Sequence, residues 1–191
     1  MRWVSRVSNA ILSVEKRLIT VLAAALVLLI LLNIVTRAAG SAIFWVDELA
    51  IYTMEWMALI GASVMLRMRV AVAVTLVTDL LPPGLRRAVA RLVDVILAFF
   101  AITLLVLSWQ WYDPLALIRS GFDFDQFAQA TFKFIYSEPT NTIGIGKFWV
   151  WLAVPLMAIS MCIHALANLL EAPAEASQSG EADIGQIGPR G

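Results

Sequence analysis

Three acidic side chains lie in a stretch that is apolar enough to cross a membrane. The stretch runs from Phe44 to Leu66, FWVDELAIYTMEWMALIGASVML, and contains Asp47, Glu48 and Glu55. A carboxylate inside a membrane span costs about 2.5 to 3.5 kcal/mol on insertion scales, so it normally has a bonding partner or a function. The chemistry that such groups offer is proton transfer, cation binding or an ion pair.

Glu55 is the acid nearest the middle of this stretch, and two interpretations of it are open. In the first, Glu55 belongs to a proton or cation path. In the second, it is buried at a contact between helices or subunits and bonded to a basic or polar partner. We favour the second, because a single acid in the middle of a span, with no second acid or histidine identified on another span as its partner, is thin support for a relay. On a helix, Glu48, Tyr52 and Glu55 share one face, while Asp47 points elsewhere.

Arg37 stands at the end of the preceding apolar stretch, and ten residues separate it from Glu48. A short turn would bring these ends of two antiparallel helices together, where an Arg–carboxylate pair is bidentate and partly desolvated. We therefore predict that Arg37 and Glu48 form a structural latch on the first helical hairpin. Further along, Gly61, Ala62 and Ser63 form a patch of small residues that allows close helix approach.

The sequence indicates no catalytic or cofactor site. Cys162 is the one cysteine and His164 the one histidine, which excludes a disulfide framework and a Cys/His metal cluster. We find no Ser/His/Asp arrangement, glycine-rich phosphate loop or metal-ligand spacing. His164 is interpreted as a packed or interfacial histidine. We expect no enzyme activity and no cofactor.

The composition is that of an integral membrane protein. Hydrophobic residues make up 61% of the 191 residues and charged residues 15%, whereas a soluble domain is about half apolar and a quarter charged. The net charge of zero argues against a nucleic-acid partner. Four stretches, at about 18–36, 44–66, 92–111 and 148–170, are long enough to span a bilayer. We predict an all-α fold with four transmembrane helices in a membrane domain covering 18–170.

The remaining segments are predicted to lie at the membrane surfaces. Residues 1–17 are mildly amphipathic, and the first span is longer than the apolar core of a signal peptide, the competing interpretation. Residues 70–81 are too short to cross alone and indicate an interfacial or re-entrant segment. The loop 113–146 contains a candidate interfacial helix with Phe127, Thr131 and Phe134 on one face, packed either on the membrane or a partner, or on the chain itself. Pro155 predicts a kink in the last span, and 171–191 a disordered tail.

The basic residues predict how the chain is oriented. Ten of the fourteen Lys and Arg residues lie in the N-terminal segment, the loop between spans two and three, and the tail. Because cytoplasmic segments carry the excess of Lys and Arg, both termini are predicted to be cytoplasmic and the loop 113–146 to face outward.

Several of these residues form a pattern that resembles a known family. The carrying residues are Asn33 and Arg37; Trp45, Asp47, Glu48 and Leu49; Trp56, Gly61 and Ala62; Arg67; and IGIGKFWVWLAVP, which ends at Pro155. In order and spacing they are similar to N-x3-R, W-x-E-E-L and W-x4-G-A of the small membrane subunit (DctQ-type) of tripartite ATP-independent periplasmic (TRAP) transporters. The resemblance covers roughly residues 15–170. Glu55 departs from it, at a position that is usually apolar.

The resemblance implies a multi-pass subunit of the bacterial inner membrane. In such transporters a periplasmic substrate-binding protein captures an organic anion, and a large membrane subunit binds the substrate and sodium and carries them by an elevator movement. The small subunit extends the fixed scaffold, in contact with membrane lipid. By this resemblance the candidate subunit-interface residues are Asn33, Trp45, Asp47, Trp56, Gly61, Ala62, Arg67 and Pro155. The alternatives are an independent small proton-coupled carrier or channel that uses Glu55, and a membrane anchor subunit of an enzyme complex.

Overall fold

The computed structural model describes residues 2–69 and 82–171, and these residues form helices joined by loops. The helices are α1 (Arg2–Ala38), α2 (Phe44–Met68), α4 (Pro83–Tyr112), α5 (Pro114–Arg119), α6 (Phe124–Thr131), α7 (Lys147–Trp151) and α8 (Ala153–Leu170). Four helical stretches are long and apolar enough to cross a membrane, which confirms the predicted all-α membrane fold. The segment predicted at 70–81, and all of the predicted tail except Glu171, lie outside the described residues.

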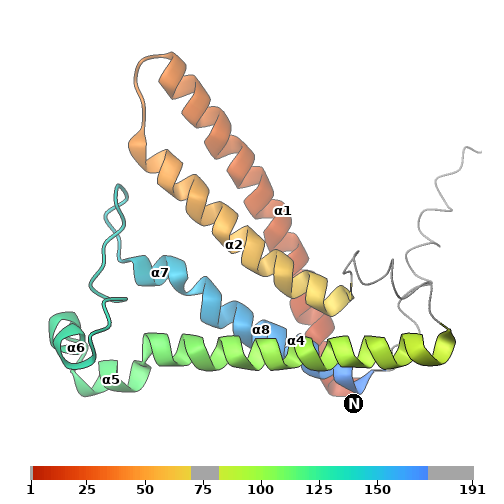
Figure 1. Ribbon diagram of the computed structural model, residues 1–191. Helices are drawn as coiled ribbons and strands as arrows, with labels where there is room; N and C mark the ends of the chain where they lie inside the picture. Colours follow the sequence, from red (N-terminus) through yellow and green to blue (C-terminus); the bar gives the residue numbers. More distant parts are fainter. Residues whose placement is uncertain (1, 70–81, 172–191) are drawn as a thin grey trace, which may run out of the picture.

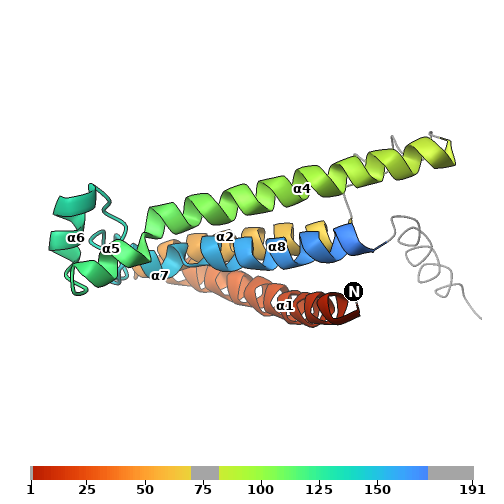
Figure 2. The same cartoon turned by 90° about the horizontal axis from the view of Figure 1, so that it is seen from below.

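The long helices are arranged in layers. Antiparallel α1 and α2 form a hairpin, α8 packs against both of them, and α4 packs against α8 (Figures 1 and 2). We call the end that holds the start of α1 and the ends of α2 and α8 the inner end, and the opposite end the outer end. The first turns of α4 project away from the other helices at the inner end (Figure 1).

The first helix is longer than the predicted span at 18–36. It runs unbroken from Arg2 to Ala38, because no Gly or Pro interrupts residues 2–38. Its 37 residues correspond to about 55 Å at 1.5 Å per residue, against about 30 Å for the hydrocarbon core of a bilayer. The structure therefore shows no boundary after residue 17.

The last membrane-crossing stretch is divided into α7 and α8 at Leu152. Pro155 lies three residues further on and lacks an N–H, so it cannot donate to the carbonyl of Trp151, and its ring crowds that carbonyl. The helix interruption predicted from Pro155 is thus present, one turn before the proline.

The outer end carries a small aromatic core of its own. Buried Tyr112, Leu117, Phe127, Ile135 and Tyr136 pack together there, and Tyr136 donates a hydrogen bond to the carbonyl of Tyr112 at 2.7 Å. Two short helices, α5 and α6, lie over this core beyond the end of α4 (Figure 2).

The helical face predicted in this loop is only partly correct. Phe127 is 1% exposed and packed within the chain, whereas Phe134 lies beyond α6 and is 56% exposed. The helix ends because Phe132 adopts the left-handed conformation, with φ of 56°. Phe127 and Phe134 therefore do not share a helical face.

Candidate functional site

The outer turn of the α1–α2 hairpin is joined by a cluster of Asn33, Arg37 and Asp47. Both Arg37 Nη2 and Asn33 Nδ2 donate to the Asp47 carboxylate, and Arg37 Nε donates to Asn33 Oδ1 at 2.7 Å. This corrects the predicted latch, in which Glu48 was the partner of Arg37. Successive helical residues point about 100° apart, and it is Asp47 that faces α1.

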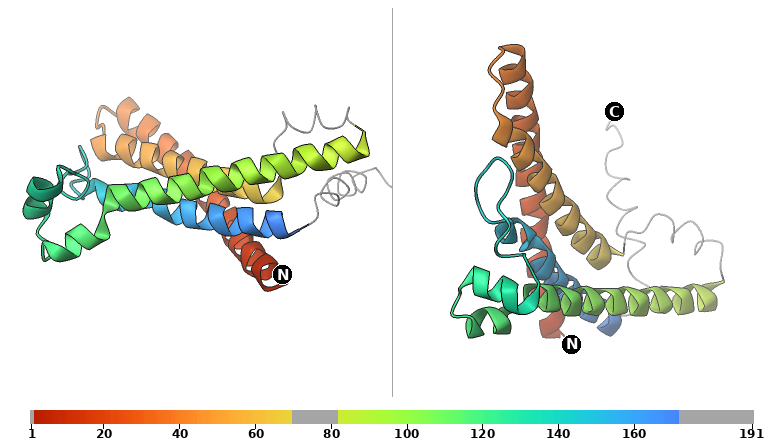
Figure 3. Two further views of the ribbon diagram at one scale, coloured as in Figure 1. Left: turned by 60° about the horizontal axis from the view of Figure 1, so that its bottom comes forward. Right: turned by 60° about the vertical axis from the view of Figure 1, so that its left-hand side comes forward.

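Glu48 instead holds the outer loop against the start of α2. Its carboxylate accepts hydrogen bonds from the backbone N–H groups of Asn141 at 2.7 Å, Thr142 at 2.6 Å and Ile143 at 3.1 Å. The Thr142 and Tyr52 hydroxyls donate to it at 2.5 and 2.6 Å. Figure 3 shows this loop rising beside the first turns of α2. A carboxylate so fully bonded within the chain is an anchor, with no lone pair left for a ligand.

Five polar side chains from three helices meet inside the bundle, and we call them the inner polar cluster: Ser8, Glu15, Ser63, Ser160 and His164. Ser63 and Ser160 donate to Glu15 Oε1 at 2.7 and 2.6 Å. His164 Nε2 lies 3.1 Å from Glu15 Oε2, and His164 Nδ1 lies 2.6 Å from the Ser8 hydroxyl. All five side chains belong to buried residues.

The inner polar cluster overturns the expectation that no acid and histidine from different helices are partners. An acid and a histidine from different helices do meet inside the bundle, although Glu55 is not among them. Ser8, His164 and Glu15 also follow the Ser–His–acid order of hydrolases, but Ser8 and His164 are 0% exposed. A nucleophile must reach its substrate, so the cluster is a clamp that joins α1, α2 and α8 rather than a catalytic site.

Sequence reasoning missed Glu15, because it stands beside Lys16 and Arg17 and resembles a solvated charge. The spacing of polar residues on two of the helices was a signal that could have found the cluster. Ser8 and Glu15 are seven residues apart, and Ser160 and His164 are four apart, so each pair occupies one helical face. Two polar pairs on apolar helices indicate a buried polar contact.

Arg67 joins three helices at the inner end. Its guanidinium donates to Asn9 Oδ1 at 2.7 Å, to Asn168 Oδ1 at 2.7 Å and to both carboxylate oxygens of Glu171 at 2.8 and 3.0 Å. The hydrogen bonds from Arg67 hold the pKa of Glu171 below its ordinary range. Arg67, a predicted interface residue, is therefore bonded within its own chain.

Asp94 ties α4 to the same end. Arg69 Nη2 lies 3.0 Å from its carboxylate and donates to the Asn168 carbonyl at 2.5 Å. Arg91 donates to the Leu169 carbonyl at 2.6 Å. The arginines thus take up the free carbonyls at the end of α8, where a helix has no intrahelical donors left.

The other predicted interface residues differ in their surroundings. Trp56 Nε1 donates to the Val150 carbonyl at 2.9 Å and so connects α2 to α7. Trp45 is 44% exposed. A Cβ built on Gly61 would meet no atom within 4 Å, and Ala62 is exposed. The small residues at 61 and 62 therefore form no close helix contact with the described part of this chain.

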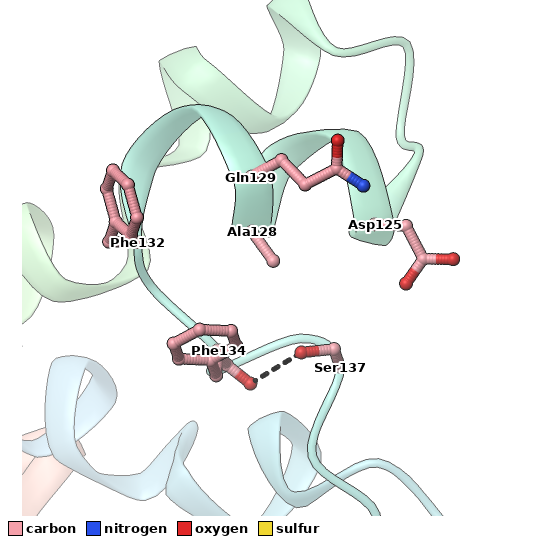
Figure 4. Close-up of a pocket in the computed structure, with 6 residues that line it drawn as sticks. All are labelled: Asp125, Ala128, Gln129, Phe132, Phe134 and Ser137. Atoms are coloured by element: carbon pink, nitrogen blue, oxygen red, sulfur yellow. Dashed lines mark hydrogen bonds between the residues drawn. The ribbon is translucent and has the colours of Figure 1, made fainter.

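Two cavities open on the described part of the chain. One, of about 340 Å³, lies between α6 and the segment after it, where Phe132 and Phe134 flank Ala128 (Figure 4). The other, of about 260 Å³, lies between α1, α2 and α7 and is largely apolar, with Trp56 and Trp149 in its lining. Within residues 2–69 and 82–171, no three His, Cys, Asp or Glu side chains are grouped so that they could hold a metal ion.

Comparison with known proteins gives the family. Residues 26–174, more than half of the chain, match the family described as tripartite ATP-independent periplasmic transporters, DctQ component. A curated relative is the C4-dicarboxylate TRAP transporter small permease protein DctQ of Vibrio cholerae serotype O1, 29% identical over 124 residues. The alignment covers 64% of this chain and 53% of the relative, so the chain spans about half the length of that protein. The chain belongs to the DctQ component family of TRAP transporters, and it is a multi-pass inner membrane transport subunit rather than an enzyme.

Proposed function

We propose that this chain is the small scaffold subunit of a sodium-driven TRAP transporter that imports an organic anion. A large membrane subunit carries the substrate and the sodium, and a periplasmic binding protein delivers the substrate. The Vibrio cholerae relative is named as the small permease protein of a C4-dicarboxylate TRAP transporter, which favours a carboxylate as the substrate.

One observation carries the proposal: the buried acids and the histidine described above, Glu15, Glu48 and His164, have hydrogen-bond partners within the chain. Glu15 and His164 are closed within the inner polar cluster, and Glu48 is closed by the outer loop. Since each of these groups already has its hydrogen bonds within the chain, none is left free to bind a substrate. These contacts favour a structural role for the chain.

The outer surface of the long helices also favours a scaffold role. Large apolar side chains remain exposed along α1 and α4, among them Leu28 at 66% and Phe99 at 72%. A membrane subunit presents such surfaces to lipid tails or to the helices of another subunit. We therefore assign the exposed faces of α1 and α4 to lipid tails, other apolar faces of the chain to the large subunit, and the outer loop to the side on which the binding protein arrives.

Uptake by reconstituted vesicles tests this function. The purified chain alone should accumulate no radiolabelled C4-dicarboxylate under a sodium gradient. The large subunit with its binding protein should accumulate it only when this chain is also present. A control without sodium should show no uptake. Accumulation by this chain alone would overturn the scaffold function in favour of an autonomous carrier.

A further inference from the structure

Glu55 differs from the other acids of the four long helices that the structure describes. Asp47, Glu48 and Asp94 each accept hydrogen bonds from partners in this chain, as does Glu15. The Glu55 carboxylate has no hydrogen bond or ion pair with any residue of the described chain. It lies about 16 Å along α2 from Phe44 and about 20 Å from Met68, at 1.5 Å per residue, and thus near the middle of the span.

The surroundings of Glu55 are an open helix face. The exposed residues of α2 next to it recur every three or four positions and form one stripe, which we call the Glu55 face: Ile51, Met54, Ala58, Ala62 and Met65. On another side of the helix, Val46, Thr53 and Ile60 are buried. Small residues let a second helix approach closely, and methionine side chains adapt to irregular neighbours. The face is therefore shaped for a helix.

The charge on Glu55 decides which occupant fits this face. Lipid tails offer no hydrogen-bond donor, so they leave the cost of a carboxylate in the membrane in place. A second copy of this chain, related by two-fold symmetry through the same face, would bring two Glu55 carboxylates together, and like charges repel. A helix from another protein that carries a basic or other donor side chain compensates the charge.

We propose that the Glu55 face binds a transmembrane helix of the large partner subunit, and that this helix donates a basic or hydrogen-bonding side chain to Glu55. The inference rests on the proposed function and adds to it the contact surface and its chemistry. Glu55 is then a specificity element, because a helix without the donor leaves the carboxylate unpaired and is rejected.

The test measures how tightly the co-expressed large subunit is held by this chain in mild detergent. We expect Glu55→Leu to weaken the affinity about tenfold or more, because it leaves the donor of the partner unpaired. Glu55→Gln keeps an acceptor oxygen, so its loss should be smaller. Leu28→Gln is the matched control: it places an amide on the exposed side of α1, away from the Glu55 face, and should leave the affinity unchanged.

Two further measurements separate a contact from a folding defect. The thermal stability of the chain alone should stay constant or rise in Glu55→Leu, since a costly carboxylate is removed from an apolar environment. A photo-crosslinking residue at Ala62 should form an adduct with the large subunit, and one at Leu28 should not.

The affinity, stability and crosslinking results each decide whether the inference holds. Three results would overturn the inference: wild-type affinity in Glu55→Leu, a lower thermal stability of the isolated Glu55→Leu chain, or an Ala62 adduct with a second copy of this chain. Each of them would leave the scaffold function standing. If the wild-type chain fails to bind the large subunit at all, the proposed function falls together with the inference.

Discussion

Single residues hold this fold together through polar contacts that bridge distant parts of the chain. In the inner polar cluster, Glu15 pairs with His164 although 149 positions separate them. Removing one partner of a buried hydrogen-bonded pair leaves the other unsatisfied, which costs more than the hydrogen bond itself contributes. Glu15 and His164 are therefore expected to depend on each other.

We expect Glu15→Leu to lower the free energy of unfolding by about 1 to 3 kcal/mol, because it leaves the buried donors of the inner polar cluster unsatisfied. His164→Leu should also destabilise the chain. The double variant should be more stable than the sum of the two losses implies, with an interaction energy of about 0.5 to 3 kcal/mol. Reversible unfolding in mixed micelles measures all three. Strictly additive losses would show that the two side chains do not act as a unit.

Glu48 gives a second prediction at this scale. Replacing Glu48 by Gln removes the charge and one acceptor oxygen from the site that holds the outer loop, and hydrogen bonds to a charged group contribute about 1.5 to 3 kcal/mol each. The amides of Asn141, Thr142 and Ile143 should then exchange with solvent about tenfold faster or more, as each 1.4 kcal/mol is a factor of ten.

The matched control for that experiment lies in the same loop. Glu138 is exposed, and its carboxylate lies 3.5 Å from the amine of Lys147. Glu138→Gln therefore removes a surface ion pair that contributes little to stability. It should leave the exchange rates of the three amides unchanged. Equal acceleration in both variants would mean that Glu48 has no special hold on the loop.

These residue-level contacts also show where sequence reasoning ends. Arg37, Asn33 and Asp47 could be placed near one another from the spacing alone, yet the choice between Asp47 and its neighbour Glu48 depends on how α2 is rotated about its axis. That rotation is set by packing against α1 and by the loop that Glu48 anchors. Neither is visible in the local sequence.

At the scale of helices, the α1–α2 hairpin allows a direct test of whether Arg37 pairs with Asp47 rather than with Glu48. In double-mutant cycles, Arg37 and Asp47 should show a coupling energy of about 0.5 to 1 kcal/mol, typical of partly exposed pairs. Arg37 and Glu48 should be additive within about 0.5 kcal/mol, because they share no contact. Stability of the purified chain is the measurement. Strong coupling to Glu48 instead would restore the predicted latch.

The inner end should respond to acid. Hydrogen bonds from Arg67 lower the pKa of Glu171 in the folded chain. A group whose pKa is lower in the folded state stabilises that state above its unfolded pKa and loses the contribution as pH falls through the folded one. The protection factors of the amides at the end of α8, which correct for the slower intrinsic exchange in acid, should therefore fall as pH drops below about 4.3, the ordinary pKa of a glutamate carboxyl. The Glu171→Gln variant should lack this step, and a step of equal size there would exclude Glu171 as its source.

The helices themselves were largely predictable, because long apolar runs bounded by charges define them. The second span was expected at 44–66 and α2 runs from Phe44 to Met68. The first was expected at 18–36, but α1 starts at Arg2, since a change from apolar to mixed residues does not end a helix that has no breaker. The left-handed residue Phe132, which ends α6, had no such signal.

For the whole molecule, the orientation in the membrane remains a prediction from basic residues, and cysteine labelling tests it. In a Cys162→Ala background, a cysteine at exposed Ser137 on the outer loop should react with a membrane-impermeant maleimide in intact spheroplasts. A cysteine at exposed Ala88, near the start of α4, should react only after the membrane is opened. The reverse pattern would invert the topology.

The inner polar cluster has a consequence for how the chain is made. Glu15 emerges from the ribosome early, and Ser160 follows only 145 residues later. At about 5 to 20 residues per second, the carboxylate waits for roughly 7 to 30 seconds before its last partners exist. During that interval the first helix occupies the membrane in an incomplete state. A chain truncated before Ser160 therefore leaves the Glu15 carboxylate without its hydrogen-bond partners Ser160 and His164.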